Sequence, residues 1–315
     1  FNSASLVITP NGVKTSKLYS IKPSDGTGDL SVTRATKATR VDESGVIVDV
    51  LANVARIDYS NGSAAILSEP QRTNLFLRSE EFNISWKQSS SSVTPDTTLA
   101  PTGLVKADTI TSTGISQVTV LQLRTITSGT VYSISFYIKQ NTQRFVYIRF
   151  TSNSLVKNTY VSAVFDLQDG TTGQTSVGTT SGTLISSDVR DAGNGFYRVS
   201  ITASINATDG NIGIGFAPAK TGNTFNTVGT ITSTVIKGNS IFLWGAQLEE
   251  GSTATSYIPT TTSSVTRNAD VISKTGLSGI TSITETFENG TTNVISGSPT
   301  SYTMSQGRIK QVIGL

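Results

Sequence analysis

The feature that most constrains this fold is a period-two alternation of apolar and polar residues along the middle of the chain, from Val131 to Glu250. Successive side chains of a β-strand point to opposite faces, so each alternating run predicts a strand with one buried face. The predicted buried faces are Tyr132/Ile134/Phe136/Ile138, Val146/Ile148/Phe150, Val161/Ala163/Phe165/Leu167, Tyr197/Val199/Ile201/Ala203/Ile205, Ile212/Ile214/Phe216 and Phe242/Trp244/Ala246/Leu248. Six amphipathic strands in one stretch favour a two-sheet sandwich.

Composition agrees with an all-β protein. Charged residues make up only 14% of the chain, whereas Ser, Thr, Asn and Gly occur throughout. That mixture is typical of short strands joined by many turns, and helices would need more Ala, Leu, Glu and Lys. No repeat of 20 to 50 residues is present, which argues against a solenoid or a propeller.

Several classes of function are excluded or disfavoured by residue types. The 315 residues contain no His and no Cys, so a Ser-His-Asp relay, a Cys-His pair, a His-based zinc site and a disulfide cannot form. The net charge of +3 is small and the basic residues are scattered, so nucleic-acid binding is not indicated. No run approaches the ~20 apolar residues of a membrane helix, and the N-terminus lacks the residue order of a signal peptide. We therefore expect a soluble protein that is not an enzyme.

Three segments differ in character. Residues 1–70 contain short strand-like pieces between turn signals, and they predict an N-terminal β module that needs a partner to bury its apolar side chains. Residues 71–268 predict the sandwich. Residues 269–315 are rich in Thr and predict a small C-terminal β unit, with a hairpin around Asn289-Gly290 and a further strand from Arg308 to Val312.

Four phrases resemble a known family. They are Glu69-Pro70-Gln71-Arg72-Thr73-Asn74-Leu75, Val131-Tyr132-Ser133-Ile134-Ser135-Phe136-Tyr137-Ile138-Lys139, Gly195-Phe196-Tyr197-Arg198-Val199-Ser200, and Leu243-Trp244-Gly245-Ala246-Gln247-Leu248-Glu249 running into Tyr257-Ile258-Pro259-Thr260. Together they resemble the phage head-spike or fibre family, across roughly residues 5 to 270. The resemblance implies a carbohydrate-binding jelly roll that resembles galactose-binding modules, and an N-terminal base that attaches the fibre to the particle.

Trp86 and Tyr147 are the candidate carbohydrate-binding residues, because flat aromatic rings pack against the C–H groups of sugars. For Trp86 the resemblance also implies a packing role, and Trp244 is in phase with apolar neighbours and is expected in the core. Similar folds hold a structural calcium with carboxylates near the first strand, and Glu80 or Glu81 are the candidates here. A solvated surface carboxylate is the commoner explanation for either, and no other cofactor is expected.

Two further patterns have ordinary explanations. The run from Gly210 to Gly215 has the wrong glycine spacing for a nucleotide loop and predicts a strand with small residues under a close neighbour. Arg34, Lys37 and Arg40 alternate faces on a strand, so solvation is the default for them, with contact to an acidic virion partner as the alternative.

These inferences favour a virion structural protein, a head fibre or tail-associated fibre that adheres to bacterial surface glycans. The expected partners are capsid, portal or tail proteins and further copies of the chain, as a trimer in preference to a dimer, because oligomerisation would cover exposed sheet edges. Two alternatives stay open. One is a capsule depolymerase or glycosidase that uses Asp and Glu only, and the other is a carbohydrate-binding module of a secreted enzyme.

Overall fold

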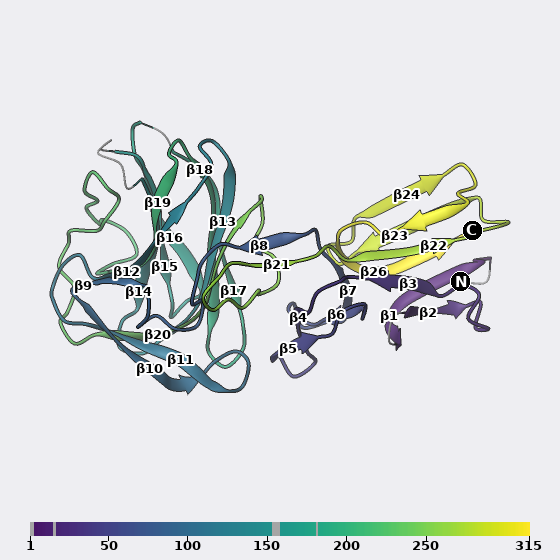
Figure 1. The fold of residues 1–315 in the computed structure, drawn as a ribbon, viewed down its shortest axis with the longest axis horizontal. Helices are drawn as coiled ribbons and strands as arrows, with labels where there is room; N and C mark the ends of the chain where they lie inside the picture. The colour runs from purple at the N-terminus through teal and green to yellow at the C-terminus, as the bar shows by residue number, and fades with distance from the viewer. Residues whose placement is uncertain (1–2, 15–16, 153–157, 181) are drawn as a thin grey trace. The chain divides into compact units, whose positions relative to one another are not determined.

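The computed structural model describes residues 3–14, 17–152, 158–180 and 182–315, and its regular elements are all β-strands (Figure 1). The all-β class is therefore confirmed. The described residues form no helix that could cross a membrane. The chain divides into two compact units. Unit 1 consists of Phe1–Arg72, Thr255–Tyr257 and Thr266–Leu315, and unit 2 consists of Thr73–Ala254 and Ile258–Val265.

Unit 2 is a jelly-roll-like sandwich of two six-stranded antiparallel sheets. The first sheet has the order β10-β11-β20-β13-β18-β17, and the second has the order β16-β15-β14-β19-β12-β9. The strands of the first sheet are β10 (Ser91–Leu99), β11 (Val105–Ser112), β13 (Val131–Gln140), β17 (Gly182–Asp191), β18 (Tyr197–Ile205) and β20 (Ser240–Glu250). Those of the second are β9 (Lys87–Ser89), β12 (Thr119–Thr125), β14 (Phe145–Thr151), β15 (Tyr160–Asp166), β16 (Thr171–Val177) and β19 (Asp209–Ala217).

The core of unit 2 lies between these two sheets. All inward positions predicted for the first five alternating runs belong to this core or pack against it. On β14, for example, Val146, Ile148 and Phe150 are fully buried in the core, and their strand partners on β15 and β19 are apolar too. Burial of these side chains, at about 1.5–3 kcal/mol each, is the main force that holds the two sheets together.

For the sixth run, the prediction of which side faces the core is wrong for the first two residues and right for the last two. Ala246 and Leu248 lie in the core as expected, but Ile241 and Leu243 join them in place of Phe242 and Trp244. The cause is a β-bulge: β13 residues Ser135 and Tyr137 pair with Gln247 and Trp244, so β20 contains one extra residue in this interval. Gly245 lies in that interval with a φ of 62°, a left-handed conformation that favours glycine. Trp244 is buried as predicted, but it contacts the Tyr137 ring, at 5.2 Å between centroids.

Unit 1 is built on one ten-stranded sheet. Eight strands follow the order β24-β23-β26-β1-β2-β3-β22-β25, while β7 also pairs with β26 and β6 pairs with β7. These strands are β1 (Leu6–Lys14), β2 (Lys17–Lys22), β3 (Leu30–Thr33), β6 (Arg56–Asp58), β7 (Ala65–Ser68), β22 (Val271–Thr275), β23 (Ser282–Phe287), β24 (Thr292–Ser296), β25 (Ser301–Thr303) and β26 (Gly307–Gly314). A separate hairpin joins β4 (Ala38–Val41) to β5 (Ile47–Val50), and the chain passes between the units near β8 (Arg72–Asn74) and β21 (Val265–Arg267).

Unit 1 differs from the three-part division expected from sequence. Residues 1–70 and 269–315 were expected to form two modules, but their strands alternate within one sheet and share one core. The N-terminal strand β1 pairs with the C-terminal strand β26, where Val7 lies opposite Ile313. The physical reason is that neither segment has enough apolar surface to fold alone, and each supplies the other with partners for its backbone groups. The hairpin predicted around Asn289-Gly290 is present as β23 and β24.

A buried ionic cluster stabilises unit 1. Asp270 forms an ion pair with Arg34, at 2.7 Å, and a second one with Arg56. Glu69 forms an ion pair with Arg56, at 2.8 Å, and another with Arg267, at 2.6 Å. Burial alone would raise the pKa of Glu69, but Arg56 and Arg267 and hydrogen bonds from Ser256 outweigh it and lower this pKa to about 2. Because Arg34 is buried and paired, solvation was the wrong expectation for it.

Candidate functional site

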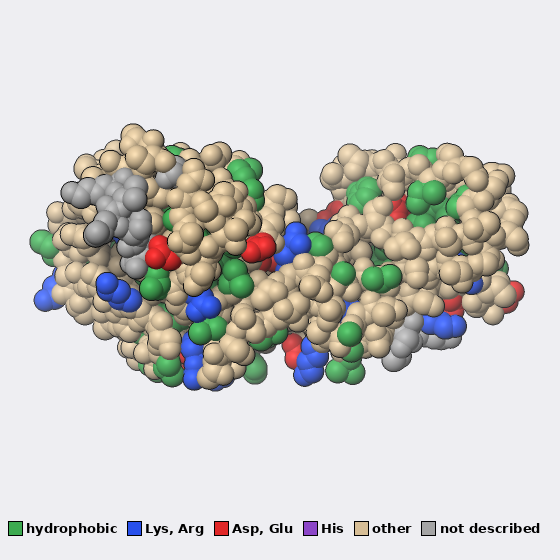
Figure 2. Space-filling model, turned by 45° about the horizontal axis from the view of Figure 1, so that its top comes forward, with side chains coloured by type: hydrophobic (Ala, Val, Ile, Leu, Met, Phe, Trp, Pro, Cys, Tyr) green, Lys and Arg blue, Asp and Glu red, His purple; other side chains and the backbone are tan. Residues whose placement is uncertain are grey.

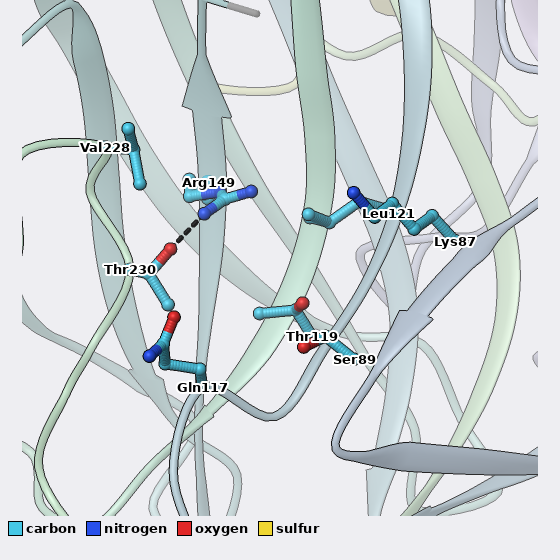
Figure 3. A pocket seen from close by; sticks show the side chains of 8 residues that line it. All are labelled: Lys87, Ser89, Gln117, Thr119, Leu121, Arg149, Val228 and Thr230. Atoms are coloured by element: carbon cyan, nitrogen blue, oxygen red, sulfur yellow. Dashed lines mark hydrogen bonds between the residues drawn. The ribbon is translucent and has the colours of Figure 1, made fainter. Parts of the chain in front are cut away.

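A basic groove on the second sheet of unit 2 is the candidate functional site. It has a volume of about 160 Å³ and opens on the sheet face that points away from the core. Eight residues line it (Figure 3): Lys87, Ser89, Gln117, Thr119, Leu121, Arg149, Val228 and Thr230. Strands β9, β12 and β14 supply most of them, and Val228 and Thr230 belong to the segment between β19 and β20.

Strand register explains why these residues lie together. Arg149 on β14 pairs with Gly213 on β19, Gly213 pairs with Leu121 on β12, and Leu121 pairs with Lys87 on β9. Directly paired residues project to the same face of a sheet, so the row places two basic side chains at its ends. Neighbouring strands are about 4.8 Å apart, so the two Cα atoms of Arg149 and Lys87 are separated by roughly three such spacings.

Glycines on β19 leave the floor of the groove open. Gly213 lies between Arg149 and Leu121, and a Cβ there would press against the backbone of Val120 and Leu121. Gly215, two residues further on, lies against the ring of Tyr147, which leaves no room for a side chain. The predicted strand with small residues under close neighbours is confirmed.

Arg149 is the most unusual residue of the groove. Its side chain is buried, with 6% of the residue exposed, and its guanidinium donates a hydrogen bond from Nη1 to the Thr230 hydroxyl (Figure 3). Its Nε has no hydrogen-bond partner among the described residues, and no carboxylate there forms an ion pair with it. Burial lowers the pKa of Arg149, which only the nearby Tyr147 raises. The groove is therefore lined by a desolvated cation that has no counter-charge among the described residues.

The remaining lining is not acidic, and it mixes polar side chains with the apolar Leu121 and Val228. None of the eight residues is Asp or Glu, while Ser89, Thr119 and Gln117 supply hydroxyl and amide groups. Lys87 is exposed and adds a second positive charge. Charged side chains are otherwise sparse and lie singly or in small groups on the face shown in Figure 2. The groove combines two cations with hydrogen-bonding groups suited to hydroxyls and oxyanions.

The structure places both aromatic residues predicted to bind carbohydrate inside unit 2. Trp86 is 5% exposed and packs among Phe76, Phe82 and Phe136, and its indole N–H donates to the Arg78 carbonyl. A buried ring offers no flat face to a sugar, so the packing role implied by the resemblance describes Trp86 better.

Tyr147 lies close to the groove but does not line it. It is two residues before Arg149 on the same face of β14, and its residue exposure is 1%. The segment between β19 and β20 covers the ring: Phe225 contacts it edge-on at 6.3 Å, and the Ile231 N–H donates to its hydroxyl. Tyr147, the residue predicted from sequence, is therefore covered, whereas Arg149 on the same strand lines the groove.

The carboxylates considered for calcium do not gather into a site. Glu81 forms an ion pair with Arg78 at 2.7 Å and is 44% exposed, and Glu80 is half-buried. The described residues contain no group of three or more acidic side chains that could hold a metal ion. Asp108, which is buried, accepts hydrogen bonds from the backbone N–H groups of Phe82 and Asp96. Burial raises the pKa of Asp108 to about 6, and the charges of Asp96 and Glu81 add to this effect.

Asn74 belongs to the first of the four quoted sequence phrases, and in unit 2 it forms hydrogen bonds with residues of the last one. Its amide Nδ2 donates to the carbonyls of Ala246 and Ile258, at 3.0 and 2.8 Å. Its Oδ1 accepts from the N–H groups of Phe76 and Leu248, both at 3.1 Å. Asn74 is fully buried, so these phrases specify how the chain is held together. They do not contribute side chains to the groove.

Sequence reasoning missed Arg149 and Lys87. The available signal was that Arg149 lies on the outward side of a strand, where the other outward residues, Phe145, Tyr147 and Thr151, are uncharged. The sequence was also compared with known proteins: no protein-family model matches it, and no curated protein matches it.

Proposed function

We propose that the chain is a structural protein of a bacteriophage particle, a head fibre or tail-associated fibre, and that unit 2 adheres to glycans on the bacterial surface. The observation that carries the adhesive part is the groove on β9, β12 and β14, which collects hydroxyl, amide and cationic groups on a rigid sheet. The part that concerns the virion rests on the family resemblance of the quoted phrases.

Several features of the groove suit weak, repeated adhesion. Its volume of about 160 Å³ is well below the roughly 300–1,000 Å³ of pockets that enclose drug-sized ligands, so it fits one sugar residue. A single contact of this size gives low affinity. Many copies on one particle would offset this, because linked sites bind with an effective concentration far above that of free sites.

An open sheet in unit 1 supports assembly with further protein chains. Among the described strands, β24 and β25 end the long path of this sheet, and each pairs with one neighbour. On β24, Val294 is 56% exposed. An unpaired edge is a template for another strand, so a trimer of the chain, or contact with a capsid, portal or tail protein, would cover it.

Analysis of purified particles tests the function directly. Antibodies raised against the chain, together with mass spectrometry of density-purified virions, should locate it on the particle surface. Light scattering after size-exclusion chromatography should give the mass of an oligomer, with a trimer favoured. A chain that is absent from purified particles and is monomeric in solution would contradict the proposal.

The two alternative functions predict different results in simple assays. A capsule depolymerase or glycosidase would release reducing ends from host polysaccharide, and this release would disappear when one carboxylate is replaced. A carbohydrate-binding module of a secreted enzyme would bind glycans without any association with particles. The adhesion proposed here requires binding without release of reducing ends.

A further inference from the structure

Arg149 is in an unusual state for a buried cation. Moving an ionised group out of water is costly unless it is paired and hydrogen-bonded, and buried arginines normally have a carboxylate beside them. Arg149 is 6% exposed, yet it forms no ion pair among the described residues and its Nε has no hydrogen-bond partner there. The ten residues outside the description include no Asp or Glu, so they cannot supply the missing carboxylate.

The Arg149 guanidinium lies at the groove, so a negatively charged partner could reach it from outside the protein. The guanidinium is at the groove, fixed on one side by the Thr230 hydroxyl, and Lys87 provides a second cation across Gly213 and Leu121 (Figure 3). A planar guanidinium held in one orientation favours a carboxylate or phosphate, because its N–H groups match the spacing of two oxygens. The groove therefore supplies the charge complement of an external oxyanion.

We propose that this groove binds an acidic sugar, with the carboxylate or phosphate of the sugar against Arg149 and its ring over Leu121. This inference rests on the glycan adhesion proposed above and specifies its ligand class. Ser89, Thr119 and Gln117 lie where they can exchange hydrogen bonds with ring hydroxyls. Lys87, which is exposed, contributes long-range attraction and a second contact to the anion.

An internal carboxylate offers the sharpest test. Thr230→Asp places a carboxylate of similar size beside the guanidinium, where it should occupy the site of the external anion. Thr230→Asn is the matched control, since it has the same shape without the charge. In the full chain we expect Thr230→Asp to bind polygalacturonate at least about tenfold more weakly than Thr230→Asn does, because the two variants differ in the charge and not in the shape of residue 230.

Ligands chosen in pairs identify the anion. Polygalacturonate is compared with the same polymer after its carboxyl groups have been reduced to alcohols, and a sugar-phosphate polymer forms the second arm. Binding to either anionic polymer that is lost in Thr230→Asp supports the proposal and identifies the source of the oxyanion. Equal binding to the carboxyl-reduced polymer, or binding that Thr230→Asp leaves unchanged, overturns it.

Thermal unfolding with monomeric galacturonate separates this inference from the function of the particle. At about five times the Kd of the wild type, the monomer should raise the Tm of the wild type by about 2–4 °C and that of Thr230→Asp by less than about 1 °C. Such a result would support the site even if the chain were absent from virions. Absence of any shift in a chain that is found on virions and binds neutral glycans would overturn the inference alone.

Lys87→Gln provides a second variant at an exposed position, where we expect little effect on folding. Lys106→Gln on β11 is its control, because Lys106 is exposed and lies on the other sheet. Each variant removes one positive charge. A loss of affinity of about threefold or more in Lys87→Gln, with none in Lys106→Gln, is the expected result, and equal effects of the two would mean that only net charge matters.

Discussion

Four arginine side chains among the described residues are buried, and the two units treat them differently. In unit 1, Arg34, Arg56 and Arg267 each contact a buried or nearly buried carboxylate. In unit 2, Arg149 has a comparable burial, and within the described part of the chain it has no such partner. A buried charge that stabilises a fold has its counter-charge within the protein. A buried charge that binds a ligand has no protein counter-charge, because the ligand supplies it. The comparison thus separates residues that hold the fold from residues available for binding.

The largest expected effect concerns the paired charges. Asp270→Asn removes the carboxylate that Arg34 and Arg56 share, so two guanidinium groups stay buried with less compensation. We expect unit 1 to lose about 3–5 kcal/mol of unfolding free energy, measured by denaturant titration or by hydrogen exchange of β3 and β22. Asp49→Asn, which breaks an exposed pair with Lys37, is the control and should cost less than about 1 kcal/mol. Similar losses in both variants would contradict the account of the cluster.

The pH dependence should have opposite signs in the two units. Glu69 has a folded pKa of about 2, below its usual 4.5, so its contribution to unit 1 is present above pH 4.5 and is lost as the pH falls towards 2. Asp108 has a folded pKa of about 6, above its usual 3.8. Unit 2 should therefore gain stability, on the order of 3 kcal/mol, as the pH falls from about 6 to 3.8. Hydrogen exchange corrected for intrinsic rates can follow both units, and parallel pH profiles would argue against this difference.

Removing the unpaired charge should produce a smaller effect of the opposite direction. Arg149→Met keeps an apolar stem of similar length and removes the desolvated cation, so we expect unit 2 to gain about 1 kcal/mol. Arg56→Met is the matched comparison in unit 1 and should destabilise, because Glu69 and Asp270 lose a partner. Chemical denaturation of both variants provides the measurement. A destabilisation by Arg149→Met as large as that by Arg56→Met would mean that Arg149 is a structural residue.

The smallest expected effect is that of an exposed charge. Lys87→Gln should change the stability of unit 2 by less than about 0.5 kcal/mol, since the side chain is in solvent. Thermal unfolding of this variant beside the wild type measures the change. A shift of several degrees would show that Lys87 supports the fold, and its use as a probe of the groove would then be unsound.

Much of the sandwich could be predicted from sequence because its signal is local. The alternation of Val146, Ile148 and Phe150 shows which side of β14 is buried without knowledge of any other strand. Where the period breaks, local reasoning fails: the bulge at Gly245 moved Trp244 out of the inter-sheet core, although its burial was predicted. The joint sheet of the two termini was missed for a related reason, because no local pattern says that β1 pairs with β26.

The candidate site was less predictable because it depends on register between distant strands. Arg149, Leu121 and Lys87 become one row only through three strand pairings, and the covering of Tyr147 depends on the segment that contains Ile231. The residues that the sequence did single out, such as Trp86, are distinctive because they hold the fold. The lone arginine carries no pattern of its own, and only its missing partner distinguishes it.

The most direct measurement is an experimental structure of the full chain with a galacturonate oligosaccharide. The account predicts a sugar in the groove of unit 2, with one carboxylate oxygen within hydrogen-bonding distance of the Arg149 guanidinium. A saccharide bound elsewhere while this groove is empty, or an Arg149 guanidinium that is turned away and paired with a carboxylate of the protein, would contradict it.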